Sequence, residues 1–275
     1  MAAEDGARFY ASYMKVAHPL IQEVRREAFG EDIGQFSWTS ADEARRFYAL
    51  LELDRTSRVL DVACGAGGPS LFMARTTGCD VTGIDVTPNG VASATELAAS
   101  LGLAERARFA CVDATGPLPF EAGAFDAVVC MDSINHFYDR VPLFRELHRV
   151  LCPGGRLLFT DPIVVTGMLQ REEMLARSGA MGRFVFSVPG VNERALAAAG
   201  FVDVETEDVT DNIERISTSW AAARARHVDA LVEVEAAEPY ATFQTFLLTV
   251  SLLSRERRLS RWLYRARAPG RQPSA

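Results

Sequence analysis

The feature that most constrains the fold is a glycine-rich turn, residues 61–68 (DVACGAGG), placed between an apolar run and a helix. The run 58–64 (RVLDVAC) is short and apolar, which is typical of a strand buried on both faces of a parallel sheet. After the glycines, Pro69 lies where a first helical turn tolerates proline. Because glycine has no Cβ, such a turn lets the backbone approach a ligand closely. The sequence therefore predicts a strand–turn–helix unit that binds a ligand.

Apolar, β-rich runs alternate with helical stretches along the rest of the chain. Strands linked by helices favour right-handed parallel crossovers. We therefore predict an α/β fold with a doubly wound, seven-stranded, mostly parallel sheet. Pro153, Gly154 and Gly155 are expected to stop a helix before the fifth strand. Besides 58–64, the expected strands are 79–85, 108–113, 125–132, 156–161, 201–209 and 261–269, and the expected helices include 141–151, one near 211–235 and one near 238–254.

Differences in composition and periodicity around this core divide the chain into four parts. Residues ahead of the first strand look helical, with a break in the stretch DIGQFSW. Met and Phe are concentrated after the fifth strand, which suits a flexible apolar cover over a substrate. We predict an N-terminal helical lid (1–53), a ligand-binding core (54–161), an inserted cap (162–190) and a C-terminal part of the core with a helical insertion (191–270).

Composition and charge limit the partners that such a chain can have. The net charge of −7 argues against a nucleic-acid partner, since a surface that follows phosphates needs clustered Lys and Arg. The five cysteines are at least 15 residues apart and form no cluster with histidine, so we predict no metal site and a reducing setting. There is no apolar run long enough to span a membrane and no signal-peptide pattern. We expect a cytoplasmic protein with no membrane association, whose oligomeric state stays open.

Three acidic residues lie at the ends of successive expected strands: Asp61, Asp85 and Asp113. A carboxylate at the end of the second strand can accept hydrogen bonds from both hydroxyls of a ribose. One at the third can receive the exocyclic amine of adenine, and Asp61 suits a ligand with a charged amino-acid end. Each acid alone also has a structural reading, because Asp commonly forms turns. Together they line one crevice at the carboxyl ends of the strands, which predicts a nucleoside-bearing ligand.

These motifs resemble those of the class I methyltransferases that use S-adenosylmethionine (SAM), over residues 30–161. DVACGAGG is similar to the nucleotide loop of that family, GID (83–85) to its ribose acid and VDA (112–114) to its adenine contact. FDAVVCMDSINHF and HRVLCPGGRLLFTD resemble its later motifs, whereas Ala63 departs from the usual glycine. DIGQFSW is similar to the HYGYW-type segment of small-molecule methyltransferases, which closes over the methionine end of SAM.

The resemblance implies a Rossmann-like methyltransferase fold, SAM as the cofactor and a small-molecule methyl acceptor from specialised metabolism. The apolar cap favours a hydrophobic acceptor. Trp38 has two readings, as a cover over the cofactor and as a residue that packs helices together. The implied cofactor contacts are Gln35, Asp61, Ala63, Gly65, Gly67, Asp85, Val86, Asp113, Ala114 and Asp132.

Methyl transfer to a hydroxyl needs a proton acceptor, whereas an amine can lose its proton to solvent. His136 follows the fourth expected strand on the side where strand ends face the ligand, and histidine can be neutral near pH 7. Asp161, at the expected end of the fifth strand, is placed to orient that imidazole or to accept the proton itself. A His and an Asp at matching positions act in similar sugar O-methyltransferases, so this pair is our catalytic prediction. In its other reading, His136 packs against the cofactor.

Other functions stay open at this point. For an alkene acceptor, a buried cap carboxylate such as Glu172 or Glu173 would stabilise a carbocation and remove its proton. The same fold can also hold SAM as a structural ligand while the pocket catalyses a non-methylating reaction such as a cyclisation. A nucleotide-dependent oxidoreductase would need glycine or alanine where this chain has Ser70, and a methyltransferase for RNA or protein would need a basic face. The acceptor atom is undetermined among oxygen, nitrogen and carbon.

Overall fold

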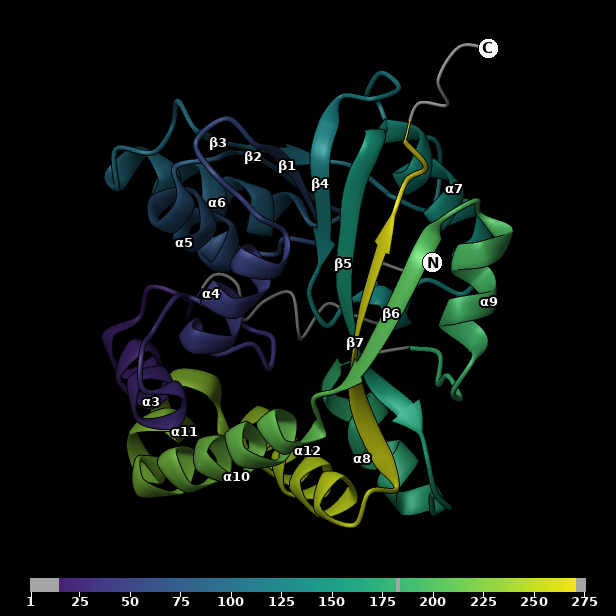
Figure 1. The fold of residues 1–275 in the computed structure, drawn as a ribbon. Coiled ribbons are helices and arrows are strands. Elements are labelled where there is room, and N and C mark those ends of the chain that lie inside the picture. Colours follow the sequence, from purple (N-terminus) through teal and green to yellow (C-terminus); the bar gives the residue numbers. More distant parts are fainter. Residues whose placement is uncertain (1–14, 182–183, 271–275) are drawn as a thin grey trace, which may run out of the picture.

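The computed structural model describes residues 15–181 and 184–270 of the chain, and its centre is a seven-stranded sheet (Figure 1). The strand order is β3-β2-β1-β4-β5-β7-β6. Strands β1 to β5 pair in parallel, and β7 runs antiparallel to both of its neighbours. The prediction of a doubly wound, mostly parallel sheet is therefore confirmed. The strands are β1 (Arg58–Val62), β2 (Asp80–Asp85), β3 (Ala107–Cys111), β4 (Phe125–Cys130), β5 (Leu151–Val165), β6 (Val202–Asp208) and β7 (Leu259–Arg267).

Helices cover both faces of the sheet, because alternate residues of each strand point to opposite sides. In β1, Val59 packs with α4 and α5 on one face, whereas Leu60 and Val62 pack with α7 and α9 on the other. All three side chains are fully buried. The covering helices are α4 (Ala41–Leu50), α5 (Gly68–Thr77), α6 (Pro88–Ser100), α7 (Arg140–Val150) and α9 (Val191–Ala198), and the short 3-10 helix η2 (Ile134–His136) follows β4.

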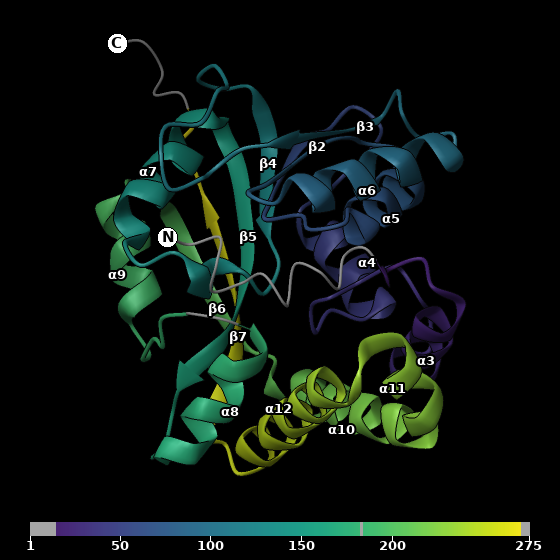
Figure 2. The ribbon, with the colours of Figure 1, turned by 180° about the vertical axis from the view of Figure 1, so that it is seen from behind.

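A second group of helices lies beyond the end of the sheet at which β5 finishes, as both views show (Figure 1, Figure 2). Helix α10 packs against α3 and α12, and α8 packs against α12. The rings of Trp38 and Trp220 meet edge to face with centroids 6.2 Å apart, and Phe246 stacks on Trp38. We call this group the helical lobe; it consists of α3 (Pro19–Phe29), α8 (Arg171–Met181), α10 (Thr210–Arg226), α11 (Val228–Glu235) and α12 (Ala237–Arg255).

The fifth strand is longer than the expected 156–161. Strand β5 begins at Leu151, directly after α7, and continues to Val165. Pairing with β4 starts at Leu151, and pairing with β7 continues to Val165. Asp161 therefore lies inside a strand and not at the strand end where the sequence had suggested it.

The expected helix near 211–235 is two helices, because α10 ends at Arg226 and α11 begins at Val228. His227, between them, lies 2.7 Å from Glu27 of α3. The break thus occurs where α10 is tied to α3. Helix α12 has 19 residues, yet no helix in the described part of the chain combines the length and apolar character needed to cross a bilayer.

Candidate active site

The glycine turn links β1 to α5, and close contacts enclose it. Gly67 has a φ of 76°, and a Cβ there would lie 2.6 Å from the Cβ of Ala94 in α6. Gly68 begins α5, and a Cβ there would lie 2.4 Å from the carbonyl oxygen of Ile33. Ala63 also adopts a positive φ, of 59°, in the left-handed region that favours glycine. Backbone conformation and contact with the N-terminal segment both fix the shape of the turn.

Asp61 lies buried near the end of β1, beneath the turn. The hydroxyl of Ser70 in α5 donates a hydrogen bond to Asp61 Oδ2 at 2.5 Å. Burial raises the pKa of Asp61 from 3.8 to about 7, and the hydrogen bond from Ser70 opposes this rise only in part. Ser70, which departs from a dinucleotide fingerprint, therefore serves as a hydrogen-bond donor to the acid. A carboxylate with one described donor retains acceptor capacity for a cation.

Asp85, the last residue of β2, ties that strand to the glycine turn. Its Oδ2 accepts a hydrogen bond from the Gly65 N–H at 2.8 Å. Its Oδ1 accepts two from Thr87, one from the N–H at 2.9 Å and one from the hydroxyl at 2.5 Å. Each carboxylate oxygen has two lone pairs, so the described contacts leave Oδ2 able to accept one more hydrogen bond. Val86, next in the chain, is 49% exposed.

The third predicted acid lies two residues beyond its strand, because β3 ends at Cys111. Asp113 is exposed, and its Oδ1 accepts hydrogen bonds from the N–H and the hydroxyl of Thr115 at 2.9 and 2.7 Å. Ala114 beside it is buried. The order β3-β2-β1 places the ends of the three strands side by side, so the three acids lie along one edge of the sheet.

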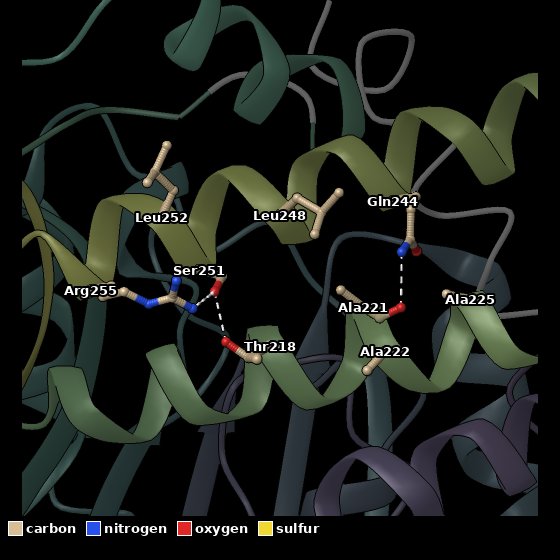
Figure 3. Close-up of a pocket in the computed structure, with 9 residues that line it drawn as sticks. All are labelled: Thr218, Ala221, Ala222, Ala225, Gln244, Leu248, Ser251, Leu252 and Arg255. Carbon is tan, nitrogen blue, oxygen red and sulfur yellow. Dashed lines mark hydrogen bonds between the residues drawn. The ribbon is translucent and has the colours of Figure 1, made fainter.

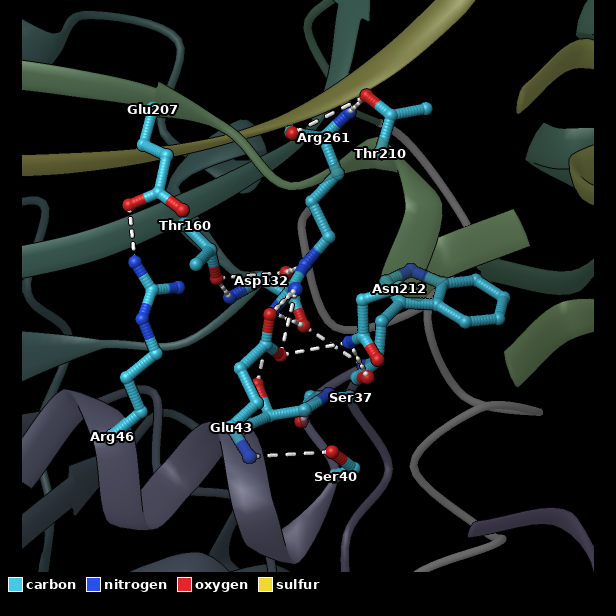
Figure 4. Close-up of polar contacts among 12 residues, drawn as sticks. Ser37, Ser40, Glu43, Arg46, Asp132, Thr160, Glu207, Thr210, Asn212 and Arg261 are labelled. Atoms are coloured by element: carbon cyan, nitrogen blue, oxygen red, sulfur yellow. Dashed lines mark hydrogen bonds and ion pairs between the residues drawn. The ribbon is translucent and has the colours of Figure 1, made fainter. Parts of the chain in front are cut away.

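Asp132 lies at the centre of a buried ion-pair network (Figure 4). Arg261 of β7 is fully buried; its Nε lies 2.7 Å from Asp132 Oδ1, and its Nη1 lies 2.8 Å from both oxygens of Glu43. Although burial lowers the pKa of Arg261, the two carboxylates raise it above its ordinary value, and burial raises the pKa of Glu43. The Trp38 N–H donates to Asp132 Oδ2 at 2.8 Å. Asp132 thus fastens the predicted lid to the sheet.

Gln35 is fully buried, and its side-chain amide binds the segment that carries it. Its Oε1 accepts from the Ile33 N–H at 2.9 Å, and its Nε2 donates to the Glu31 carbonyl at 3.3 Å. Asp32 pairs with the buried Arg25 at 2.7 Å. These contacts brace the segment internally and tie it to α3, and a contact of Gln35 with the cofactor stays a prediction.

His136 and Asp161 differ in their surroundings. His136 ends η2, just after β4, and its side chain is exposed. Asp161 is fully buried, and its Oδ2 accepts hydrogen bonds from Arg140 Nη1 at 2.9 Å, Ser187 Oγ at 2.8 Å and Asn192 Nδ2 at 3.0 Å. The expected role of Asp161 as proton acceptor or as partner of His136 does not match these contacts, because Asp161 is the counterion of a buried arginine. The cause is that β5 continues past Asp161, which faces α7 and α9 and not an open strand end.

The two cap glutamates are not free buried carboxylates. Glu172 is exposed. Glu173 lies 2.6 and 2.7 Å from the guanidinium of Arg258 and accepts the Gln170 N–H at 2.8 Å. The hydrogen bond from Arg258 lowers the pKa of Glu173. Solvent exposure in one case and an ion pair at the start of α8 in the other do not fit the role of a base for an alkene acceptor.

The family follows from comparison with known proteins. Residues 60–159 match the family model described as a methyltransferase domain. The 27-O-demethylrifamycin SV methyltransferase of Amycolatopsis mediterranei (strain S699) is 32% identical over 230 residues, which cover 82% of each chain. The chain is a class I SAM-dependent methyltransferase of small molecules.

Two solved structures resemble this methyltransferase. The [4+2]-cyclase SpnF aligns with a TM-score of 0.75 at 26% identity, covering 98% of this chain and 97% of that one. Phosphoethanolamine N-methyltransferase 2 of Haemonchus contortus, in complex with SAM, aligns with a TM-score of 0.78 at 21% identity, covering 94% of this chain and 60% of that one. At that identity, the second likeness shows the fold alone.

The methyltransferase also has a cluster of possible metal ligands between α3 and the end of α10. Glu23, Glu27 and His227 each place one ligand atom within 4.8 Å of the others. Glu27 is already engaged, since its carboxylate lies 2.7 Å from His227 and 2.5 Å from Arg226. These hydrogen bonds lower the pKa of Glu27. Ion pairs account for the cluster, so we assign no metal to it.

A groove of about 380 Å³ runs between α10 and α12 (Figure 3). Two hydrogen bonds cross it, from Gln244 Nε2 to the Ala221 carbonyl at 2.9 Å and between the hydroxyls of Thr218 and Ser251 at 2.6 Å. None of the site residues predicted from the sequence lines this groove. The groove therefore belongs to the packing of the helical lobe and not to the edge with the three acids.

Proposed function

We propose that the methyltransferase binds SAM along the edge of β1, β2 and β3 and methylates a small, apolar metabolite. The observation that carries the proposal is Asp61, a buried carboxylate whose described donor is Ser70. Burial raises the pKa of Asp61, and the nearby charge of Asp85 adds to the rise, so the ammonium of the methionine end of SAM would supply a favourable opposite charge. In the same arrangement Asp85 holds the ribose hydroxyls, and Asp113 with Ala114 meets the adenine.

The other cofactor contacts that we propose are of two kinds. Gly65, Gly67 and Ala63 shape the turn so that its backbone reaches the methionine end, and Val86 offers apolar surface beside the adenine. The second kind acts through the lid, because one member braces the segment that touches the turn at Gly68 and the other ties the lid to the end of β4. These two residues are Gln35 and Asp132.

SAM supplies an activated methyl group, so the residues of this chain have to align the acceptor, exclude water and receive a proton. We propose that residues 1–53 and 162–190 act as lid and cap over the acceptor. For a hydroxyl acceptor, His136 is the proton acceptor, since it follows β4 at the same edge of the sheet. The name of the Amycolatopsis relative, which specifies a 27-O-demethyl substrate, supports a hydroxyl. Asp161 is a positioning residue that holds Arg140 at the start of α7.

Calorimetry with SAM, S-adenosylhomocysteine and NAD tests the cofactor edge, and binding of NAD alone would overturn it. His136→Ala tests the proton acceptor, with hydroxylated apolar metabolites as acceptors and the mass gain of one methyl as the readout. We expect kcat to fall about 10²- to 10⁴-fold with an unchanged Kd for S-adenosylhomocysteine. The matched control is His18→Asn, which keeps a side-chain acceptor at the N-cap of α3 and should leave kcat unchanged. An unchanged kcat in His136→Ala would remove the assignment.

The likeness to the cyclase SpnF favours a second function, in which SAM is bound but not consumed. That likeness covers nearly the whole of both chains. Because both functions require bound SAM, the residues of the cofactor edge do not distinguish them. Product mass separates the two functions. A product with one added methyl and an equal amount of S-adenosylhomocysteine supports methyl transfer, and a rearranged product of unchanged mass supports a cyclase.

A further inference from the structure

Arg177 is a buried arginine of α8 whose guanidinium has no hydrogen-bond partner on two of its nitrogens. The side chain is 3% exposed, and neither Nε nor Nη1 meets an acceptor among the residues that the structure describes. The guanidinium lies over two aromatic rings, with distances to the ring centroids of 5.6 Å for Phe184 and 5.4 Å for Phe246. Ring contacts account for its position, but they leave both N–H groups without an oxygen.

The lack of a carboxylate partner sets Arg177 apart within the described chain. Asp161 is the carboxylate whose charge acts on Arg177, and it is already paired with Arg140 at 2.9 Å. Burial lowers the pKa of Arg177 to about 9, so the group still carries its charge at neutral pH. The other buried arginines all have carboxylate partners: Arg25 with Asp32, Arg140 with Asp161, Arg224 with Glu235 and Arg261 with Asp132.

Arg177 lies between the elements that we propose to cover the acceptor. Phe184, under its guanidinium, precedes Val185, whose N–H donates to the Asn135 carbonyl at 2.7 Å. Asn135 is the neighbour of His136, the proposed proton acceptor. On the other side, Phe246 stacks on Trp38 of the lid with centroids 5.8 Å apart. Arg177 is therefore connected through its two ring contacts to the cap, the lid and η2.

We propose that Arg177 binds a carboxylate of the methyl acceptor, and that the acceptor is therefore a singly charged acid with an apolar body. This inference rests on the proposed function, since it specifies the substrate class of the same site. The planar fork of a guanidinium matches the two oxygens of a carboxylate. One uncompensated cation neutralises one negative charge, which favours a carboxylate over a phosphate dianion. The neighbouring rings of Phe184 and Phe246 provide apolar contact for the rest of the molecule.

Matched acids and amides test the proposal on the full chain saturated with S-adenosylhomocysteine. The probes are 2-naphthoate with 2-naphthamide, decanoate with decanamide, and 2-naphthyl phosphate. We expect at least one acid to bind about tenfold or more tightly than its amide, the factor of a charge-assisted hydrogen bond, and to bind more tightly than the phosphate. Equal binding of acid and amide in both pairs would overturn the proposal, as would preference for the phosphate. Failure of S-adenosylhomocysteine to bind would instead contradict the proposed function.

Two substitutions of Arg177 assign the preference to its side chain. Arg177→Met should abolish the preference for the acid, leave the affinity for S-adenosylhomocysteine unchanged and raise Tm, because it removes a buried charge that has no partner. Arg177→Lys should retain part of the preference, since it keeps the charge without the fork, and it serves as the readout if the Met variant does not fold. The control is Arg224→Met, which leaves Glu235 unpaired and should lower Tm. A preference for the acid that persists in full in Arg177→Met would contradict the proposal. A lowered Tm of that variant would show a structural role instead.

Discussion

The edge with the glycine turn and the junction between the sheet and the proposed lid are held by different means. At the edge, Asp85 and Gly65 are 20 residues apart, and Asp61 and Ser70 are 9 apart. At the junction, Arg261 reaches carboxylates 129 and 218 residues away. Backbone conformation, short-range hydrogen bonds and contact with the N-terminal segment fix the edge, whereas buried ion pairs fix the junction. Substitutions that unpair a charge and substitutions that strain a turn should therefore affect the two regions differently.

The largest effect is expected at the junction. Arg261→Met would leave Glu43 and Asp132 buried without their cation, and breaking a buried pair in this way costs about 3–5 kcal/mol. Urea unfolding at neutral pH measures the loss. The glycine turn is untouched but Asp132 loses its cation, so any weaker binding of S-adenosylhomocysteine by the folded variant should come from the proposed lid and not from the turn.

Arg46→Met is the control for burial at the junction. Arg46 of α4 pairs with Glu207 at the surface, where both side chains are partly exposed. Screening by solvent limits such a pair to less than about 1 kcal/mol. Equal losses of stability in Arg46→Met and Arg261→Met would contradict burial as the source of the difference.

At the turn, Gly67→Ala should destabilise the protein by about 3 kcal/mol, the sum of left-handed strain and overpacking. Its Cβ would meet Ala94 at 2.6 Å, so weaker binding of S-adenosylhomocysteine should accompany the loss. Gly102→Ala separates the two causes, because Gly102 has a similar φ of 68° and no atom within 4 Å of an added Cβ. It should cost about 1–2 kcal/mol and leave binding unchanged. Equal costs in the two variants would show that contact with Ala94 is unimportant.

The same contrast explains what the sequence could predict. Short stretches of chain connect the glycine turn with Asp61 and Asp85, and strand–helix alternation places their strands side by side. The fold and the edge could therefore both be predicted from the sequence. From the sequence, Ser70 was only a departure from the dinucleotide-binding fingerprint. Its hydrogen bond to Asp61 depends on how the first turn of α5 lies against β1, which the sequence does not give. Asp113 follows the end of β3 by two residues, which is within the usual error of a strand boundary.

The contacts of the junction and of the acceptor region could not be predicted from the sequence in this way. Asp132 and Asp161 were both recognised as acids near strand ends, but their partners Arg261 and Arg140 depend on contacts between distant segments. Asp161 was also misplaced, because pairing with β7 extends β5 beyond it. Arg177 gave no signal of its own in the sequence, because the cap also contains Arg171 and Arg183. Recognising its missing partner required the structure.

A test of the edge itself follows from Asp61. Its raised pKa means that the ligand-free protein gains stability from protonated Asp61 below pH 3.8 and loses it as pH rises through about 7. The ammonium of S-adenosylhomocysteine should lower this pKa, so binding should release a proton near pH 6, and affinity should fall up to about tenfold per pH unit below 7. Calorimetry in two buffers of different ionisation enthalpy measures the release. Asp61→Asn should abolish it, and a proton release that persists in this variant would place the titrating group elsewhere.

The smallest effect is expected at the cap. Glu173→Gln removes the charge that pairs with Arg258, and because the pair is only partly buried and the amide oxygen can still accept from Arg258, the loss of stability should be about 1 kcal/mol. Because Glu173 is held in an ion pair and has no proposed role in proton transfer, kcat should not change. Glu172→Gln, at the exposed neighbouring position, is the control for the loss of one negative charge on α8. A large fall in kcat for Glu173→Gln, but not for Glu172→Gln, would show that Glu173 acts as a base. Catalytic groups would then lie in the cap as well as at the edge of the sheet.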